Sequence, residues 1–343
     1  MPSFRTGTVV DILEARAGLQ RATIDLGSEP ERAYVLTQIT GPVAVGDRVV
    51  VNTTAVELGL GTGGWHVVHW NLARSEFDDT GTGTVMKLRY TSAQLDVGGA
   101  EQEWPELADV RTIDGMPVVA ASLHSQLAAI AVAYKHARPG GRLVYVMTDG
   151  GALPIAISDL VWHLRERQLL DATITAGHAF GGDYEAVTVA GALAIARHVV
   201  HADAAVVAMG PGGVGTATAL GFSGLETGAV LDIATALDGR PIAAVRYSDA
   251  DPRARHRSLS HHTITALTTA TQTRVVVALP ASLALDTTDL ARHELVRVPE
   301  IGVVELMHAR DLDVSSMGRP AAADPWLFEC AAAAGTVAAA QVP

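Results

Sequence analysis

The chain has 343 residues, of which 48% are hydrophobic and 18% are charged, and its formal net charge is -12. This composition excludes a disordered chain, and frequent Gly and Pro interrupt the long apolar run that a membrane span needs. The negative charge argues against nucleic acid and against an anionic membrane surface as partners, because both are bound through a broad basic face.

The length predicts two domains. The N-terminal segment "MPSFRTGTVVDILEARAG" has no basic stretch followed by a sustained apolar core, so no secretory signal is expected. The single cysteine, Cys330, allows no internal disulfide, and both features favour a cytoplasmic location. Cys330 lies in "LFECAAAAGTVAAA", where we expect it to pack as a small apolar residue in a helix.

Residues 1–72 have the alternating pattern of short strands. Apolar, often β-branched residues alternate with polar ones in "TGTVVDIL", "QRATIDL", "RAYVLTQI", "DRVVVNT" and "WHVVHW". Strands at this spacing predict a small all-β, barrel-like domain of the OB or SH3-like kind. Because no aromatic stripe lies among basic residues, a structural or dimerising role is favoured over oligonucleotide binding. The second domain is expected to span residues 73–343.

From Met116 onward the pattern changes to strand, loop and helix in repetition. Continuous apolar strands are expected in "PVVAAS", "RLVYVMT", "ATITAG", "AAVVAM", "IAAVRY" and "RVVVAL". This alternation predicts a doubly wound, mainly parallel α/β sandwich, a Rossmann-like domain, closed by a helix that begins near Asp324 and Pro325. Ligands bind beyond the carboxyl ends of such strands, so the functional site is expected there.

Three strand ends carry candidates for acid–base chemistry. Ser122 is expected to cap a helix and to place His124 in its first turn, where the helix dipole favours the neutral ring; a packed structural histidine is the alternative. Asp149 precedes two glycines and can reach a ligand or close an Asx-turn. His178 lies in a glycine-rich loop that would let its ring face a crevice. Asp183 follows, as a catalytic acid or a helix N-cap.

The glycine-rich segment "GPGGVGT", residues 210–216, follows the strand "AAVVAM". It satisfies the G-x-G-x-x-G pattern before an expected helix, as in dinucleotide-binding proteins. The match is weak, because the acid at the end of the next strand, Asp249, comes later than the usual spacing of about 20 residues. The less specific prediction is a loop whose backbone N–H groups bind a phosphate or carboxylate. The residues assigned to it are Gly210, Gly212, Gly213, Gly215 and Thr216.

The segment "SDADPRARHRSLSHHTIT", residues 248–265, concentrates positive charge in an acidic chain. Forked guanidinium donors suit a small anion, and Ser260 is expected to cap the helix that follows. The arginines assigned to the anion are Arg253, Arg255 and Arg257.

Metal coordination by the three histidines of this segment, His256, His261 and His262, together with Asp249 or Asp251, is the weaker hypothesis. They lack the H-E-x-x-H spacing, the adjacent pair is expected to point in different directions, and the arginines would repel a cation. No metal site is therefore assigned. His261 is retained as an acid–base candidate.

Four segments together resemble a known family. "MTDGGALP", "TAGHAFGGDYEAV", "AMGPGGVGTAT" and "ADPRARHRSLSHHTITAL" are similar to those of an uncharacterised bacterial, largely actinobacterial, family catalogued as domain of unknown function 3866. The resemblance extends over nearly the whole chain, including the N-terminal strands. It implies no reaction, substrate or catalytic residue, so the function has to be argued from the site.

Three functions are compatible with these patterns. The first is an enzyme that acts on a small anionic metabolite, such as a phosphorylated one, with His178 and His261 as acid–base groups supported by His124, Asp149 and Asp183. The second is a nicotinamide- or flavin-dependent oxidoreductase that uses the glycine pattern. The third is a ligand-sensing or scaffold protein without a reaction. No cofactor is identified, and a homodimer is the general expectation for a soluble protein.

Overall fold

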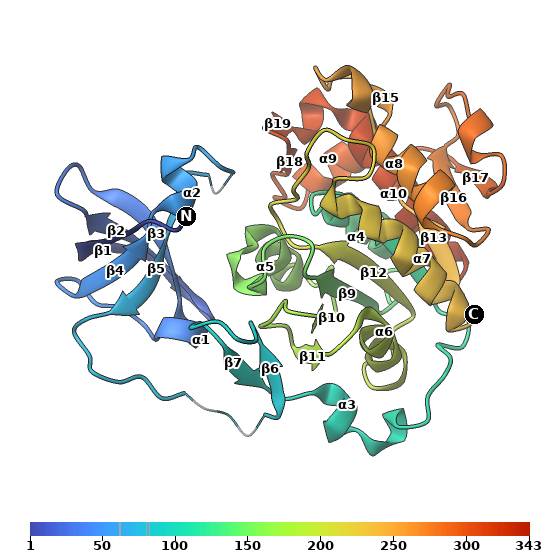
Figure 1. The fold of residues 1–343 in the computed structure, drawn as a ribbon. Helices are drawn as coiled ribbons and strands as arrows, with labels where there is room; N and C mark the ends of the chain where they lie inside the picture. Colours follow the sequence, from blue (N-terminus) through green and yellow to red (C-terminus); the bar gives the residue numbers. More distant parts are fainter. Residues whose placement is uncertain (62, 80, 82) are drawn as a thin grey trace. The chain divides into compact units, whose positions relative to one another are not determined.

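The structure of the chain is a computed structural model that describes residues 1–61, 63–79, 81 and 83–343. It divides into two compact units, Met1–Val97 and Gly98–Pro343. Figure 1 shows the first unit in blue to cyan and the second in teal to red. No helix in the described ranges is long and apolar enough to cross a membrane.

The first unit contains a closed five-stranded barrel with the strand order β1-β2-β3-β5-β4. All neighbours are antiparallel except β3 and β5. The strands are β1 (Phe4–Arg16), β2 (Leu19–Asp25), β3 (Glu31–Leu36), β4 (Arg48–Asn52) and β5 (His66–Asn71), with short helices α1 (Thr37–Thr40) and α2 (Thr54–Glu57). Alternate residues such as Val9, Ile24 and Val49 fill the interior, because successive side chains of a strand face opposite sides. The predicted N-terminal barrel is confirmed.

A hairpin follows the barrel within the same unit. It consists of β6 (Val85–Lys87) and β7 (Leu95–Val97). The barrel itself ends with β5 at Asn71, next to the expected boundary at residue 72, and the compact unit continues to Val97. The short helix α3 (Ala100–Glu103) opens the second unit.

The second unit is built on an eight-stranded sheet in which every pair of neighbours is parallel. The strand order is β11-β10-β9-β12-β8-β13-β16-β17. The strands are β8 (Pro117–Ala121), β9 (Leu143–Thr148), β10 (Ala172–Ala176), β11 (Tyr184–Ala186), β12 (Ala204–Met209), β13 (Arg240–Ala243), β16 (Val276–Pro280) and β17 (Glu294–Val298). The central strands β8, β9 and β12 are buried along their whole length, as continuous apolar runs require.

Helices cover both faces of this sheet (Figure 1). One core is formed mainly with α4 (Gln126–Ala137), α5 (Asp159–Glu166), α9 (Val303–His308) and α10 (Pro325–Ala340). The other is formed mainly with α6 (Val189–His198) and α7 (Glu226–Ala236). The predicted doubly wound α/β sandwich is confirmed. Cys330 is fully buried in α10, as expected of a small apolar residue.

The smaller elements lie after β13 and near the C-terminus. They are β14 (Tyr247–Ser248), β15 (Ser258–Leu259), α8 (His261–Thr265), the π-helical turn Ala266–Ala270 that continues α8, β18 (Ser315–Ser316) and β19 (Arg319–Pro320). β14 pairs with β15 and β18 with β19 in two short antiparallel hairpins.

Two expected boundaries are wrong. The segment after β10 forms the edge strand β11 before α6 begins, and Thr188 caps α6 by accepting a hydrogen bond from the Gly191 N–H. Asp183 is therefore not the N-cap of that helix. The strand predicted in "IAAVRY" ends at Ala243, and Tyr247 belongs to the separate hairpin β14–β15.

Helices α4 and α10 approach each other closely because small residues face each other across their contact. α10 carries a run of alanines followed by Gly335, and a Cβ atom at Gly335 would overlap the carbonyl oxygen of Ile130 in α4. Both helices are buried over most of their length. The close approach of the two backbones at Gly335 and Ile130 therefore limits the separation of the two helices.

We predict that Gly335→Ala destabilises the chain by about 1–3 kcal/mol, the usual cost of overpacking a tight core. The matched control is Gly140→Ala, since a Cβ atom there meets nothing within 4 Å. The measurement is the urea midpoint of both variants and the wild type. A Gly335→Ala variant as stable as the control would contradict the close contact.

Candidate functional site

A cavity of about 220 Å³ lies beyond the carboxyl ends of β8, β12 and β13. Three segments supply most of its lining: Ser122 and Leu123 after β8, parts of residues 213–224 after β12, and parts of residues 246–262 after β13. Met317, from the turn between β18 and β19, completes the lining. The cavity therefore occupies the edge of the sheet at which parallel α/β proteins bind ligands.

The glycine-rich segment enters the cavity as a hairpin and not as a helix entrance. The Thr216 N–H donates to the Gly221 carbonyl (2.7 Å), and the Ser223 N–H donates to the Val214 carbonyl (2.8 Å). The helix α7 begins only at Glu226. The context that the dinucleotide pattern requires, a glycine loop leading straight into a helix, is therefore absent at this segment, and that part of the prediction is wrong. Gly213 and Gly215 do line the cavity.

The cationic segment is organised by one buried carboxylate, that of Asp251, whose side chain is 1% exposed. Arg253 donates to it twice, from Nε to Oδ1 (2.9 Å) and from Nη2 to Oδ2 (2.8 Å). Arg319 Nη2 lies 3.3 Å and Arg246 Nη2 lies 3.8 Å from the same Oδ2 atom. The hydrogen bonds from Arg253 hold the pKa of Asp251 well below its usual range, so the carboxylate stays ionised.

Positive charge exceeds negative charge around this carboxylate. Asp324 is the second buried acid, and it accepts from Arg319 at 3.0 Å. Arg246 is 3% exposed; burial lowers its pKa to about 10, which still leaves the guanidinium charged at neutral pH. The cavity is lined by Arg246, Arg253 and Arg255, and no acidic residue lines it in the part of the chain that the structure describes.

Three histidines gather beside these arginines. The ring centroids of His261 and His262 are 4.4 Å apart, those of His256 and His262 4.7 Å, and those of His256 and His261 5.0 Å. His262 also stacks on Phe222 with a centroid distance of 3.7 Å. The expectation that His261 and His262 point in different directions is wrong, because their rings lie next to each other, and the turn Ala254–His256 adds His256 to the pair.

Burial and the nearby guanidinium groups keep the three rings neutral. Desolvation, then the charge of Arg246, lower the pKa of His256 and of His262 to about 3. Desolvation, then the charge of Arg255, also lower the pKa of His261. At neutral pH each ring therefore carries one proton and one lone pair. Neutral imidazoles are suited to accept a proton or to bind a metal ion.

Ser122 and His124 differ from their expected roles. Ser122 does not cap α4, whose N-cap is Ser125; its hydroxyl is buried, lines the cavity and has no hydrogen-bond partner among the described residues. His124 precedes α4 and is not in its first turn. Burial lowers the pKa of His124 to about 4.

His124 connects three elements at the edge of the sheet. Its Nδ1 lies 3.1 Å from the Met209 carbonyl at the end of β12 and 3.2 Å from the Tyr145 hydroxyl in β9. Its Nε2 lies 2.7 Å from the hydroxyl of Ser158, the N-cap of α5. Both ring nitrogens are thus engaged, which matches the alternative of a packed structural histidine.

A second group of polar residues follows β9 and β10. The Asp149 carboxylate accepts a hydrogen bond from the His178 N–H (2.9 Å), so the two strand ends are tied together. Glu226, at the start of α7, accepts from the Thr148 hydroxyl (2.5 Å), and burial raises its pKa. Neither Asp149 nor His178 lines the cavity of about 220 Å³.

Asp183 lies at the edge of the sheet, just before β11. Its Oδ2 accepts from the backbone N–H (2.8 Å) and the hydroxyl (3.0 Å) of Thr173, and the carboxylate pairs with Arg165 at 3.2 Å. These contacts join β11 to β10 and α5. They give Asp183 a structural task that its position after two glycines did not indicate.

The cavity brings together some of the predicted residues and leaves others outside its lining. Gly213, Gly215, Arg253 and Arg255 line it. Those that do not are Gly210, Gly212, Thr216, Arg257, His261, His178, His124, Asp149 and Asp183. His261 nevertheless contacts two residues that do, His256 and His262.

Sequence reasoning did not assign Arg246, Asp251, Arg319 or Glu226 to the site. Arg246 had a detectable signal, since an arginine ends the apolar run "IAAVR". Arg319 and Glu226 come from distant parts of the chain and carry no local signal.

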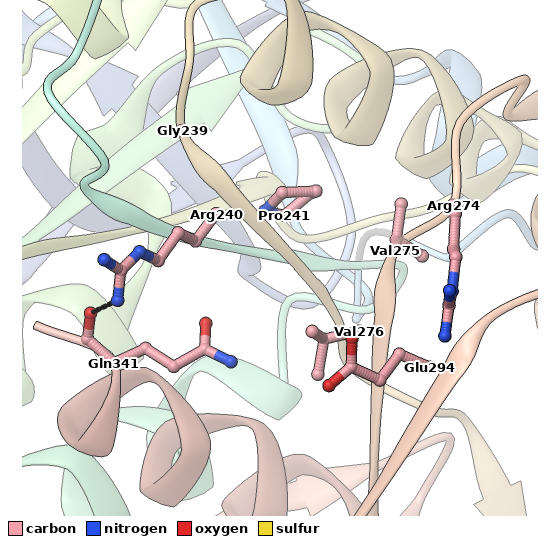
Figure 2. A pocket seen from close by; sticks show the side chains of 8 residues that line it. All are labelled: Gly239, Arg240, Pro241, Arg274, Val275, Val276, Glu294 and Gln341. Carbon is pink, nitrogen blue, oxygen red and sulfur yellow. Dashed lines mark hydrogen bonds between the residues drawn. The ribbon is translucent and has the colours of Figure 1, made fainter.

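A further cavity, of about 390 Å³, lies at the opposite edge of the sheet, where β13, β16 and β17 begin. Figure 2 shows Arg240 joined to the Gln341 carbonyl on one side of it, at 2.6 Å, and Arg274 and Glu294 on the other. Ligands of parallel sheets bind at the carboxyl edge, so this cavity is the less favoured one.

The sequence is matched by a family model over residues 32–335, and the description of that family is "Protein of unknown function (DUF3866)". No curated protein matches the chain.

We predict that Asp251→Asn destabilises the chain by about 3–5 kcal/mol at pH 7, because it leaves buried guanidinium charge without a partner. The pKa of Asp251 is lowered in the folded state. Its contribution to the free energy of unfolding is therefore fully present above pH 4 and is lost as the pH falls further. Urea denaturation at pH 7 and below pH 4 measures both effects.

The matched control for this prediction is Asp249→Asn, which removes an exposed acid two residues away. It should change the urea midpoint little. Equal midpoints for the two variants at pH 7 would contradict the organising role of Asp251.

Proposed function

The chain belongs to this family of proteins of unknown function, and we propose that it is an enzyme acting on a small anionic metabolite, such as a phosphate ester. The metabolite would bind in the cavity beyond β8, β12 and β13. The observation that carries the proposal is the lining of that cavity, which includes three arginines and, among the described residues, no acid. An anion is the ligand that such a surface attracts.

Arg255 is the arginine best placed to bind this anion. Arg253 is held by Asp251, and Arg246 Nη1 donates to His262 Nδ1 at 3.0 Å. Arg255 is exposed and forms no ion pair with the residues that the structure describes. The unpartnered hydroxyl of Ser122 offers a further hydrogen bond from another side of the cavity.

The cavity size favours a small substrate over a dinucleotide. Its volume of about 220 Å³ lies below the roughly 300–1,000 Å³ of sites for larger ligands. The glycine segment next to it forms a hairpin, so it does not lead straight into a helix as a pyrophosphate-binding glycine loop does. Both observations support the metabolite over a nicotinamide or flavin cofactor.

Reactive groups are available next to the bound anion. His262 and His256 line the cavity and are neutral at pH 7, since the pKa of each is lowered to about 3. A pKa of about 3 makes each ring a weak base while the cavity is empty, and the charge of a bound anion would raise both pKa values and make the rings better proton acceptors. His178 and Asp149, which lie after β10 and β9, stay predicted acid–base residues for a substrate that extends toward them.

We predict that Arg255→Ala weakens the binding of inorganic phosphate by about 10- to 100-fold, because charged hydrogen bonds contribute roughly 1.5–3 kcal/mol. Isothermal titration calorimetry of the full chain with phosphate measures the affinity. A panel of phosphorylated and carboxylated metabolites, followed by mass spectrometry, then identifies the substrate.

The control is Arg274→Ala, an exposed arginine at the other cavity, which should bind phosphate like the wild type. Loss of binding in Arg274→Ala but not in Arg255→Ala would overturn the proposed site. Tight binding of a metabolite without any turnover would instead favour the ligand-sensing alternative.

A further inference from the structure

The three histidines beside the cavity form a donor set for a metal ion. One nitrogen from each of His256, His261 and His262 can be chosen so that all three lie within 4.8 Å of one another. Three imidazoles with a fourth position left open are the arrangement of catalytic zinc sites. The cluster joins the cavity through His256 and His262, so an open position would face the bound anion.

Two of the rings have a nitrogen suited to coordination. His261 Nε2 is buried and has no hydrogen-bond partner among the residues that the structure describes. His256 Nδ1 is held by the Ser260 hydroxyl at 2.8 Å, and the same hydroxyl accepts from the His262 N–H. A hydrogen bond to one nitrogen of a ring orients the other toward a metal, as in known zinc sites.

His262 needs a rearrangement, because Arg246 Nη1 donates to its Nδ1. A guanidinium only donates, so this bond engages the Nδ1 lone pair, and the proton of the neutral ring lies on Nε2. A metal ion would replace Arg246 at Nδ1. Arg246 has another acceptor to turn to, since its Nη2 lies 3.8 Å from Asp251 Oδ2.

We propose that His256, His261 and His262 bind one divalent ion of the zinc class, with its open position toward Arg255, and that this ion and the anion strengthen each other's binding. This inference rests on the proposed function only for the identity of the second ligand. Imidazole donors favour Zn²⁺, Co²⁺, Ni²⁺ and Cu²⁺ over Mg²⁺ and Ca²⁺, which prefer oxygen.

In the sequence analysis the arginines were a reason against a metal site, because they would repel a cation. The same repulsion explains why binding of the metal ion and binding of the anion should be coupled. Asp251 pairs with Arg253 and Asp324 with Arg319, so these two carboxylates offset the positive charge of two of the nearby arginines. Arg255 is not offset in this way by the described residues. An anion bound to Arg255 would cancel the remaining repulsion between guanidinium and metal, so each ligand should raise the affinity for the other.

The test uses the full chain after treatment with a chelator. Titration with Zn²⁺ alone should give one ion per chain, and Co²⁺ alone should give the visible absorption of a four-coordinate ion. Inorganic phosphate should tighten Zn²⁺ binding by at least about 5-fold, a coupling in the usual range, and shift the Co²⁺ spectrum. His261→Ala and His262→Asn should each weaken Zn²⁺ binding by more than about 10-fold.

The matched control is His136→Ala, which removes an exposed histidine at the end of α4 and should bind Zn²⁺ like the wild type. Thermal unfolding of the metal-free proteins shows that the variants are folded. Absence of a bound ion in the wild type, or equal Zn²⁺ affinity in the His261 and His262 variants, would overturn the inference.

The two proposals fail separately. Phosphate binding at Arg255 without any bound Zn²⁺ or Co²⁺ would overturn the metal site and leave the proposed function intact. Binding of Zn²⁺ that phosphate does not affect would overturn the coupling. If Arg255→Ala and the wild type bind phosphate equally while Zn²⁺ still binds through the histidines, the proposed anion site is wrong and the metal site stands.

Discussion

The site depends on the ion pairs that the buried carboxylate of Asp251 forms with the arginines around it. A carboxylate with a 1% exposed side chain is tolerated only if charged partners surround it, and Arg253 and Arg319 contact it directly. These contacts fix the path of the chain after β13. Arg246 lies near the same carboxylate and donates a hydrogen bond to His262. Asp251 therefore also helps to position the histidine cluster. Arg255 is left at the cavity for a ligand.

Most of the fold could be predicted from the sequence because it depends on short-range alternation of side chains. The barrel strands alternate in burial, and the central parallel strands are continuously apolar, so each has a distinct pattern. Elements with mixed patterns were missed. The edge strand β11 has only three residues, of which two are half-buried and one is buried, and it follows a glycine pair that equally suits a helix start.

The lining residues that were predicted, Gly213, Gly215, Arg253 and Arg255, lie in two short segments that each have a distinctive composition. Arg253 and Arg255, which line the cavity, were assigned to an anion because they concentrate forked guanidinium donors in one short segment of an acidic chain. The pairing of Asp251 with Arg319 joins residues 68 positions apart in sequence, which no local pattern records. The convergence of the three histidines could not be predicted from their spacing either. It depends on the turn at Ala254–His256, which returns His256 to the start of α8. The glycine pattern led to a wrong prediction of a helix entrance. Glycines at these positions suit a phosphate-binding loop and also suit the hairpin that Thr216 and Gly221 close in the structure.

The central claim, an anion site at the cavity beyond β8, β12 and β13, is tested most directly by the crystal structure of the chain soaked with tungstate. Tungstate resembles phosphate in shape and charge, and anomalous scattering locates the tungsten atom without interpretation of weak density. We expect the tungsten atom in this cavity, with tungstate oxygens within hydrogen-bonding range of Arg255 and of the Ser122 hydroxyl. Tungsten bound only at the other cavity, between Arg240 and Arg274, would contradict it.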